Sequence, residues 1–204
     1  MTTSRIRFEA KDLVLPILAM TGVVALSNFA VQYPIQAFGL ADYLTWGALT
    51  YPVAFLVNDL TNRRFGPKMT RRVVYAGFAI AVVLSIVLAT PRIALASGTA
   101  FMVGQLLDVT VFNWLRRQTW WRAPLAGSLL GSALDTIIFF TLAFAGDLSM
   151  SDPVTYAGGI TVPLWMGLGF FDFCVKVAMA LLLLVPYGAL MSIIRPFETA
   201  RAGR

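Results

Sequence analysis

GQLLDVTVF at residues 104–112 and GSALDTIIF at residues 131–139 share Gly, Leu, Asp and Phe at the same spacing. Each phrase lies in an apolar stretch of about 20 residues, the length that crosses the hydrocarbon core of a bilayer. A carboxylate inside such a span costs about 2.5–3.5 kcal/mol, so Asp108 and Asp135 should have partners or a function. Two such acids in neighbouring spans indicate a polar site inside a helical bundle, and hence a carrier of something polar.

Apolar stretches of this length recur along the chain, which is 58% hydrophobic and 13% charged. They predict an all-α integral membrane protein, a bundle of six transmembrane helices in one domain over residues 1–204. The expected spans are 13–33, 43–61, 73–90, 93–115, 123–146 and 161–191. We expect Pro186 to mark a bend near the end of the last span, because proline removes one helical hydrogen bond.

The basic residues set the expected orientation of the bundle. Fourteen of the sixteen Lys and Arg fall at the two termini and in the 61–72 and 115–123 connections, which all lie on one side of the membrane. Cytoplasmic connections carry the excess of positive charge in membrane proteins. The pattern therefore predicts that the N- and C-termini are both cytoplasmic, which requires an even number of spans.

Composition also excludes several kinds of chemistry. The chain has no His, so it cannot use imidazole relays or Ser-His catalysis, and its single cysteine, Cys174, cannot form an intrachain disulfide. We expect Cys174 to be a packed, inert thiol. No phosphate-binding glycine loop or zinc motif is present, so we predict no enzyme activity, no cofactor and no metal. The net charge of +6 is spread between spans rather than gathered on a basic face, which argues against direct nucleic-acid binding.

In the fourth span, Gln105 and Asp108 share a helix face with Phe112. An amide, a carboxylate and flat aromatic surfaces together suit a planar, hydrogen-bonding ligand such as a nucleobase. The alternative is a core face whose polar groups pair with the fifth span. In that span, Gly131 and Asp135 share a face. Either Asp135 binds the substrate or a proton, or this face forms a tight helix interface in which Asp135 is hydrogen-bonded to a neighbour.

Other polar residues are candidates for coupling or for an entrance. Asp172 and Lys176 are four residues apart, so they either neutralise each other or form a switch that protonation of the acid would open. Asp59, at the predicted cytoplasmic boundary, is a further coupling candidate, or it pairs with Arg63 or Arg64. Asn28 and Gln32 share one face near the outer end of the first span and could line an entrance.

From Ser27 to about Gly188 the chain resembles the bacterial queuosine precursor transporters, also called the vitamin uptake transporter family. The residues that carry the resemblance are Ser27-Asn28, Val31-Gln32-Tyr33-Pro34, Leu44-Thr45-Trp46-Gly47-Ala48, Phe55-Leu56-Val57, Asp59-Leu60-Thr61, Phe65-Gly66, Arg71-Arg72, Gly104-Gln105, Leu107-Asp108-Val109, Val111-Phe112-Asn113, Leu115-Arg116, Asp135-Thr136, Phe139, Asp172, Cys174 and Lys176. In the family these polar motifs occur in the same order, within six spans of the same length.

The resemblance implies import of 7-cyano-7-deazaguanine or its aminomethyl analogue across the bacterial inner membrane, for insertion into tRNA as queuosine. A carboxylate accepts the adjacent N–H groups of such a base in parallel, so we expect Asp108 or Asp135 to read this edge. Gln105 and Asn28 would complete the hydrogen bonds, and Phe101, Phe112 or Phe139 would stack on the ring.

Two other functions fit the same residues. One is the substrate-capturing subunit of an energy-coupling vitamin or nucleobase uptake complex, although the first span lacks an Ala-x-x-x-Ala docking pair. The other is an integral membrane protein without transport activity. The expected partners are a small-molecule substrate and the lipid bilayer, and the sequence leaves homo-oligomerisation open.

Overall fold

The computed structural model describes residues 10–30, 33, 35–37, 43–88, 90–156 and 158–196. Most of them lie in the helices α1 (Val14–Ala30), α2 (Trp46–Thr50), α3 (Val53–Phe65), α4 (Pro67–Leu88), α5 (Pro91–Leu115), α6 (Arg122–Phe144) and α7 (Leu164–Leu190). The other elements in this part of the chain are the short 3-10 helices η1 (Ala10–Leu13) and η3 (Leu148–Met150) and the strands β1 (Pro153–Thr155) and β2 (Thr161–Pro163).

The helices α5, α6 and α7 are long and apolar enough to cross a membrane. They coincide closely with the predicted spans 93–115, 123–146 and 161–191. The chain is therefore a helical membrane protein, as predicted. Proline does not end the last helix, since α7 continues through Pro186 to Leu190.

The predicted span 43–61 is not one continuous helix. It consists of α2 and α3, which meet at Tyr51 and Pro52. Pro52 has no N–H group, so the helical hydrogen bond back to the Ala48 carbonyl cannot form. The chain resumes helical bonding with the amides of Ala54 and Phe55, which donate to the carbonyls of Tyr51 and Pro52.

The predicted basic connection at 61–72 is almost absent. Gly66, with φ of +78°, ends α3, and Pro67 begins α4 in the next position. Glycine tolerates positive φ, and proline suits the first turn of a helix because its missing N–H would have no partner there. Lys68, Arg71 and Arg72 therefore belong to the first turns of α4 and not to a loop.

A short antiparallel hairpin precedes α7, which corrects the expectation of an all-α chain. Val154 pairs with Val162, and Gly158 and Gly159 both have positive φ between the strands. The sequence between the fifth and sixth predicted spans, which contains Asp147, Asp152 and Pro153, indicated only a connection. Strands of three residues are too short to produce a visible alternation of apolar and polar positions.

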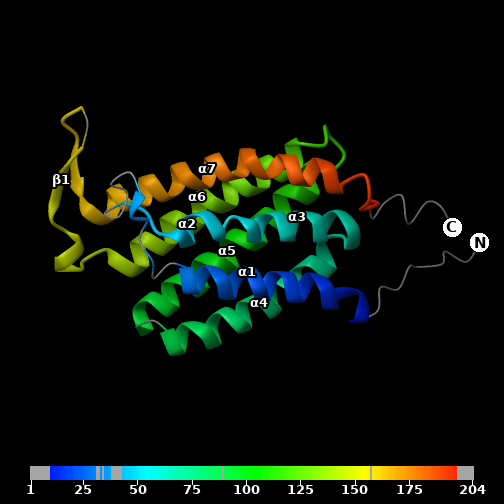
Figure 1. Cartoon of the computed structure of the whole chain (residues 1–204), viewed down its shortest axis with the longest axis horizontal. Coiled ribbons are helices and arrows are strands. Elements are labelled where there is room, and N and C mark those ends of the chain that lie inside the picture. Colours follow the sequence, from blue (N-terminus) through cyan, green and yellow to red (C-terminus); the bar gives the residue numbers. More distant parts are fainter. Residues whose placement is uncertain are drawn as a thin grey trace, which may run out of the picture.

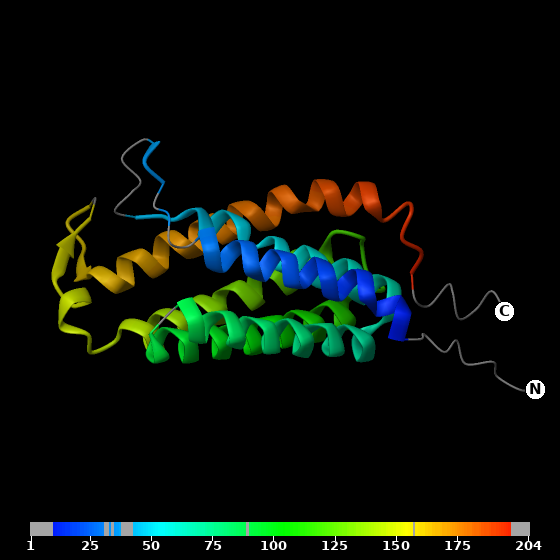
Figure 2. The same cartoon turned by 60° about the horizontal axis from the view of Figure 1, so that its bottom comes forward.

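The helices pack as layers around the antiparallel pair α5 and α6 (Figures 1 and 2). The helix α4 lies against α5 and α1 lies against α4, while α7 lies against α6 and α3 is inserted beside α4 and α5. In Figure 1 the start of α1 and the end of α7 lie at the same end of the bundle, and the hairpin lies at the other end. One apolar cluster joins α1, α3, α4 and α5 through Met20, Ala54, Val73, Val74 and Phe101.

The two copies of the repeated phrase face each other across the α5–α6 interface. A Cβ added to Gly104 would lie 3.0 Å from the Cβ of Asp135. A Cβ added to Gly131 would lie 2.9 Å from the Gly104 carbonyl oxygen and 3.4 Å from the Cβ of Asp108. Each glycine thus leaves room for the aspartate of the other copy, so the phrase encodes both close helix approach and the position of two acids.

Replacement of Gly131 by alanine should destabilise the bundle. The new methyl group would lie 2.7 Å from a carbon of the Phe55 ring as well as against the Gly104 carbonyl. Overpacking of this kind costs about 1–3 kcal/mol, so the midpoint of thermal unfolding in detergent should fall by about 2–12 °C. The control is Gly22→Ala on α1, where no atom lies within 4 Å of the added Cβ. Equal midpoints for the two variants would contradict the close approach.

Candidate functional site

Polar side chains from α3, α5, α6 and α7 meet in the interior of the bundle. The buried members are Asn58, Asp59, Gln105, Asp108, Ser128, Ser132, Asp135, Thr136 and Lys176. Inside a bilayer no water reaches such groups, so each must find its partners within the protein or in a ligand. The interior is therefore organised by how these groups pair.

One cluster contains two carboxylates and one ammonium group, from Asp135, Asp172 and Lys176. Lys176 Nζ lies 2.8 Å from Asp135 Oδ2 and 2.6 Å from Asp172 Oδ2. The Tyr51 hydroxyl donates to Asp135 Oδ1 at 2.8 Å, and the Thr136 hydroxyl donates to Asp172 Oδ2 at 2.9 Å. The cluster links α6 to α7 and, with all three groups ionised, carries a net charge of −1.

A second group of polar atoms lies between α3 and α5. Asn58 Nδ2 donates to Asp108 Oδ2 and to the Gln105 carbonyl oxygen. Several buried atoms here have no hydrogen-bond partner: Asn58 Oδ1, Asp108 Oδ1, Gln105 Oε1 and Gln105 Nε2. Unpartnered buried polar atoms are costly, so this group of side chains is suited to receive hydrogen bonds from a ligand and to donate them.

Glycine on α6 makes space for the Asp108 carboxylate. A Cβ on Gly127 would overlap Asp108 Oδ1 and lie 3.3 Å from the Asp108 carbonyl oxygen. The Asp108 side chain is fully buried, and its partner in the hydrogen bonds described above is the neutral Asn58 amide. It differs in this respect from Asp135, which already pairs with a cation.

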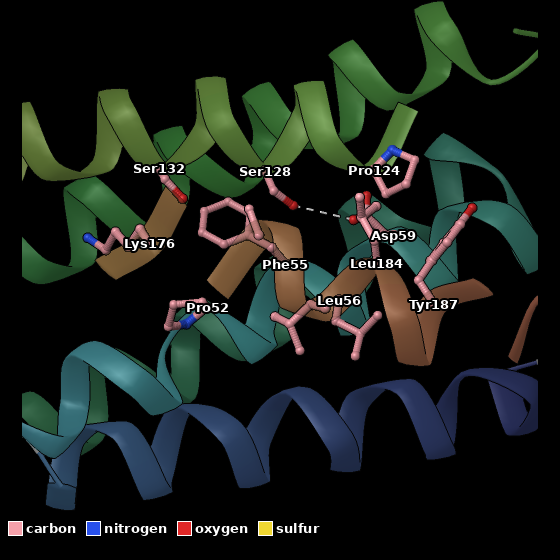
Figure 3. Close-up of a pocket in the computed structure, with 12 residues that line it drawn as sticks. Pro52, Phe55, Leu56, Asp59, Pro124, Ser128, Ser132, Lys176, Leu184 and Tyr187 are labelled. Atoms are coloured by element: carbon pink, nitrogen blue, oxygen red, sulfur yellow. Dashed lines mark hydrogen bonds between the residues drawn. The ribbon is translucent and has the colours of Figure 1, made fainter. Parts of the chain in front are cut away.

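A narrow pocket lies between α3, α6 and α7 (Figure 3). Its lining residues are Pro52, Phe55, Leu56, Asp59, Pro124, Ser128, Ser132, Lys176, Ala180, Leu183, Leu184 and Tyr187. The Ser128 hydroxyl donates a long hydrogen bond of 3.5 Å to Asp59 Oδ2. The free space has room for about one water molecule, so the structure represents a closed conformation of this pocket.

Two arginines donate hydrogen bonds between helices at the end of the bundle where α7 ends. Arg63 donates from Nε to the Ile194 carbonyl at 3.0 Å and from Nη2 to the Met191 carbonyl at 3.3 Å. Arg116 Nη2 donates to the Asn62 carbonyl at 2.7 Å. These bonds join α3 to the end of α7 and to the end of α5.

The structure brings most of the predicted site residues together and separates others. Gln105, Asp108, Asp135, Asp172, Lys176 and Asp59 all contribute to the polar interior. Phe112 packs instead toward the bundle end, against Tyr187, and Phe139 is half-buried against Phe140 and Phe144. Gln32 lies outside the described residues, and the side chain of Asn28 is not among those described.

Two side chains of the interior were not predicted as site residues, and one expectation was wrong. Tyr51 and Asn58 hold the carboxylates of Asp135 and Asp108. Asn58 was detectable as a polar residue within an apolar stretch, whereas Tyr51 resembles any interfacial aromatic. Cys174 is exposed on α7, and not packed as expected, because it lies on the face of α7 that points away from the bundle.

Comparison with known proteins points to one family of transporters. Residues 45–90 and 83–191 match the family described as "Putative vitamin uptake transporter". The chain is 35% identical over 204 residues to the "Probable queuosine precursor transporter" of Haemophilus influenzae, with 84% of this chain and 83% of the relative covered. It is 34% identical over 196 residues to the "Queuosine precursor transporter" of Escherichia coli, with the same coverage. No solved structure matches the chain.

Replacement of Lys176 by methionine should strongly destabilise the protein. The change leaves the carboxylates of Asp135 and Asp172 buried and side by side without their cation, which costs about 3–5 kcal/mol. The measurement is the midpoint of thermal unfolding of the purified protein in detergent.

The double variant Lys176→Met with Asp135→Asn is the matched test of this charge argument. It removes one positive and one negative charge, so the cluster returns to a net charge of −1. The double variant should therefore be more stable than Lys176→Met alone. A double variant no more stable than the single one would show that charge balance does not explain the effect.

Proposed function

Because the chain belongs to the vitamin uptake transporter family, we propose that it imports queuosine precursors, 7-cyano-7-deazaguanine or 7-aminomethyl-7-deazaguanine, across a bacterial inner membrane. Relatives named as queuosine precursor transporters align with 84% of the chain. The structural observation that carries the proposal is a polar interior enclosed by apolar helices, with unpartnered hydrogen-bonding atoms on Gln105 and Asp108.

The proposed membrane arrangement has six crossings with both termini in the cytoplasm. The crossings are α1, the broken pair α2 and α3, and then α4, α5, α6 and α7. This count agrees with the start of α1 and the end of α7 lying at one end of the bundle (Figure 1). The basic residues at the start of α4 and around the α5–α6 connection lie at that same end, which favours the cytoplasm there.

Of the two acids in the repeated phrase, Asp108 is the stronger candidate to read the base. Asp135 already accepts hydrogen bonds from Tyr51 and Lys176, whereas Asp108 Oδ1 has no partner. A guanine-like edge presents adjacent N–H groups, and a carboxylate accepts them in parallel with charge-assisted hydrogen bonds. The Gln105 amide can both donate to and accept from the remaining polar atoms of the ring.

Other predicted residues have supporting roles in the proposal. Phe101 lies one turn from Gln105 on α5 and would offer a stacking surface, while Phe112 packs against Tyr187 and Phe139 lies farther along α6 among other phenylalanines. Asn28 and Gln32 remain proposed entrance residues. The charge cluster of Asp172 and Lys176 would couple binding to helix movement, because a polar ligand that competes for one member frees the other.

Uptake in living cells tests the proposal and the Asp108 assignment together. In cells that cannot synthesise the precursor and lack other importers, this chain should restore queuosine in tRNA when 7-cyano-7-deazaguanine is supplied at limiting concentration. Asp108→Asn keeps the shape of the side chain and removes the charged acceptor, so restoration should fall about tenfold or more. The measurement is the queuosine content of tRNA, with membrane levels of each variant quantified.

The matched control for this experiment is Asp147→Asn. Asp147 is a partly exposed acid just before η3, and the hydrogen bond from the Ser149 hydroxyl lowers its pKa, so it carries a charge outside the polar interior. This variant should transport as well as the wild type. No restoration by the wild type would refute the function, and full restoration by Asp108→Asn would refute only the residue assignment.

A further inference from the structure

The pocket between α3, α6 and α7 lies beside the Gln105–Asp108 group, and its lining does not include either residue. We propose that this pocket is a second binding site for the transported base, on the cytoplasmic side of Lys176, with Asp59 as its hydrogen-bond acceptor. The inference rests on the proposed function, because it names the same class of ligand: a planar base with adjacent N–H donors. The proposal adds a second binding site along the transport path through the bundle.

Asp59 has the properties of an unfilled acceptor. Its side chain is 2% exposed and lines the pocket, and Oδ1 has no hydrogen-bond partner. Oδ2 receives only the 3.5 Å hydrogen bond from Ser128, and the ion pairs among the described residues do not include Asp59. Two N–H groups from a ligand would supply the hydrogen bonds that this buried carboxylate lacks.

The walls of the pocket fit a flat ring. Phe55, Leu56 and Leu184 supply apolar surface, and the view in Figure 3 places the Phe55 ring between Asp59 and Lys176. Apolar walls with polar groups at the ends are typical of sites for planar heteroaromatic ligands. Ser128 and Ser132, one turn apart on α6, add hydroxyl groups along one side.

The opposite end of the pocket offers a hydrogen-bond donor. Lys176 lines it, and Ser132 lies near it in Figure 3. The three N–H groups of Lys176 are taken by Asp135, Asp172 and Thr136, so this end is anchored to both α6 and α7, and the donor that it offers a ligand is the Ser132 hydroxyl. A base whose N–H edge meets Asp59 would direct an acceptor on its far side, such as a nitrile nitrogen, toward the Ser132 hydroxyl.

Movement of α7 would open the site. Ala180, Leu183 and Leu184 of α7 form one wall of the closed pocket. The hydrogen bonds from Arg63 to the carbonyls of Met191 and Ile194 hold the end of α7 against α3. Breaking these bonds would let the wall swing outward at the end of the bundle where the cytoplasm is proposed to lie, and would release the base there.

Equilibrium binding of radiolabelled 7-cyano-7-deazaguanine to the purified full chain in nanodiscs tests the proposal, with every variant also made in an Asp108→Asn background so that binding at the Gln105–Asp108 site does not mask the second site. Asp59→Asn should weaken binding about tenfold or more, because the charged acceptor is lost. Ala180→Leu should also weaken binding at least about tenfold, because the larger side chain fills the pocket. The matched control is Ala178→Leu, two positions away on the exposed face of α7, which should bind as the wild type does.

Ser132→Val, from the opposite wall, is the second pocket variant in case Ala180→Leu fails to fold, and unfolding midpoints identify such a failure. Wild-type binding with unchanged affinity in Asp59→Asn and in the folded pocket variants would overturn this site and leave the transporter intact. Absence of binding by the wild type would count against the proposed function itself. Adenine, which lacks the pair of adjacent N–H donors, should not compete.

Discussion

The interior of this bundle depends on the ion pairs that the ammonium group of Lys176 makes with two carboxylates. The ammonium group lies between the carboxylates of Asp135 and Asp172, and so neutralises one unit of the negative charge that α6 and α7 bring together. The Tyr51 hydroxyl donates a further hydrogen bond to Asp135, and the Thr136 hydroxyl donates one to Asp172. Because Tyr51 lies at the break between α2 and α3, its bond connects that break to the charged cluster. Since hydrocarbon offers no water to separate these charges, their attraction fixes the distance between α6 and α7.

Close packing of α5 and α6 supplies the second constraint. Gly104 and Gly131 allow the two backbones to approach until each glycine lies beside the other helix's aspartate. The same short phrase therefore has the same packing role on both helices of an antiparallel pair. One of its acids is neutralised by a lysine, and the other faces an amide. Two similar local sequences thus have different electrostatic environments, because the helices beside them, α3 and α7, differ.

The sequence predicted the helical membrane fold and the acids of the interior, because long apolar stretches and buried charges are visible along one chain. It did not predict how the acids pair. The i,i+4 spacing indicated the contact between Asp172 and Lys176, but the third member, Asp135, comes from another helix and leaves no trace in local spacing. The break at Pro52 was also missed, and the connection around Gly66 and Pro67 was expected to be longer than it is, because hydropathy is averaged over windows longer than a single turn.

The break between α2 and α3 has a mechanical consequence. A continuous helix transmits a tilt along its whole length through its ladder of hydrogen bonds, and at Pro52 one of those bonds is missing. The short helix α2 packs on α1 and α7, whereas α3 carries Asn58 and Asp59 into the interior. The missing bond makes Pro52 the point at which this pair of helices bends most easily, so that α2 can follow α7 while α3 keeps its polar side chains in register with α5.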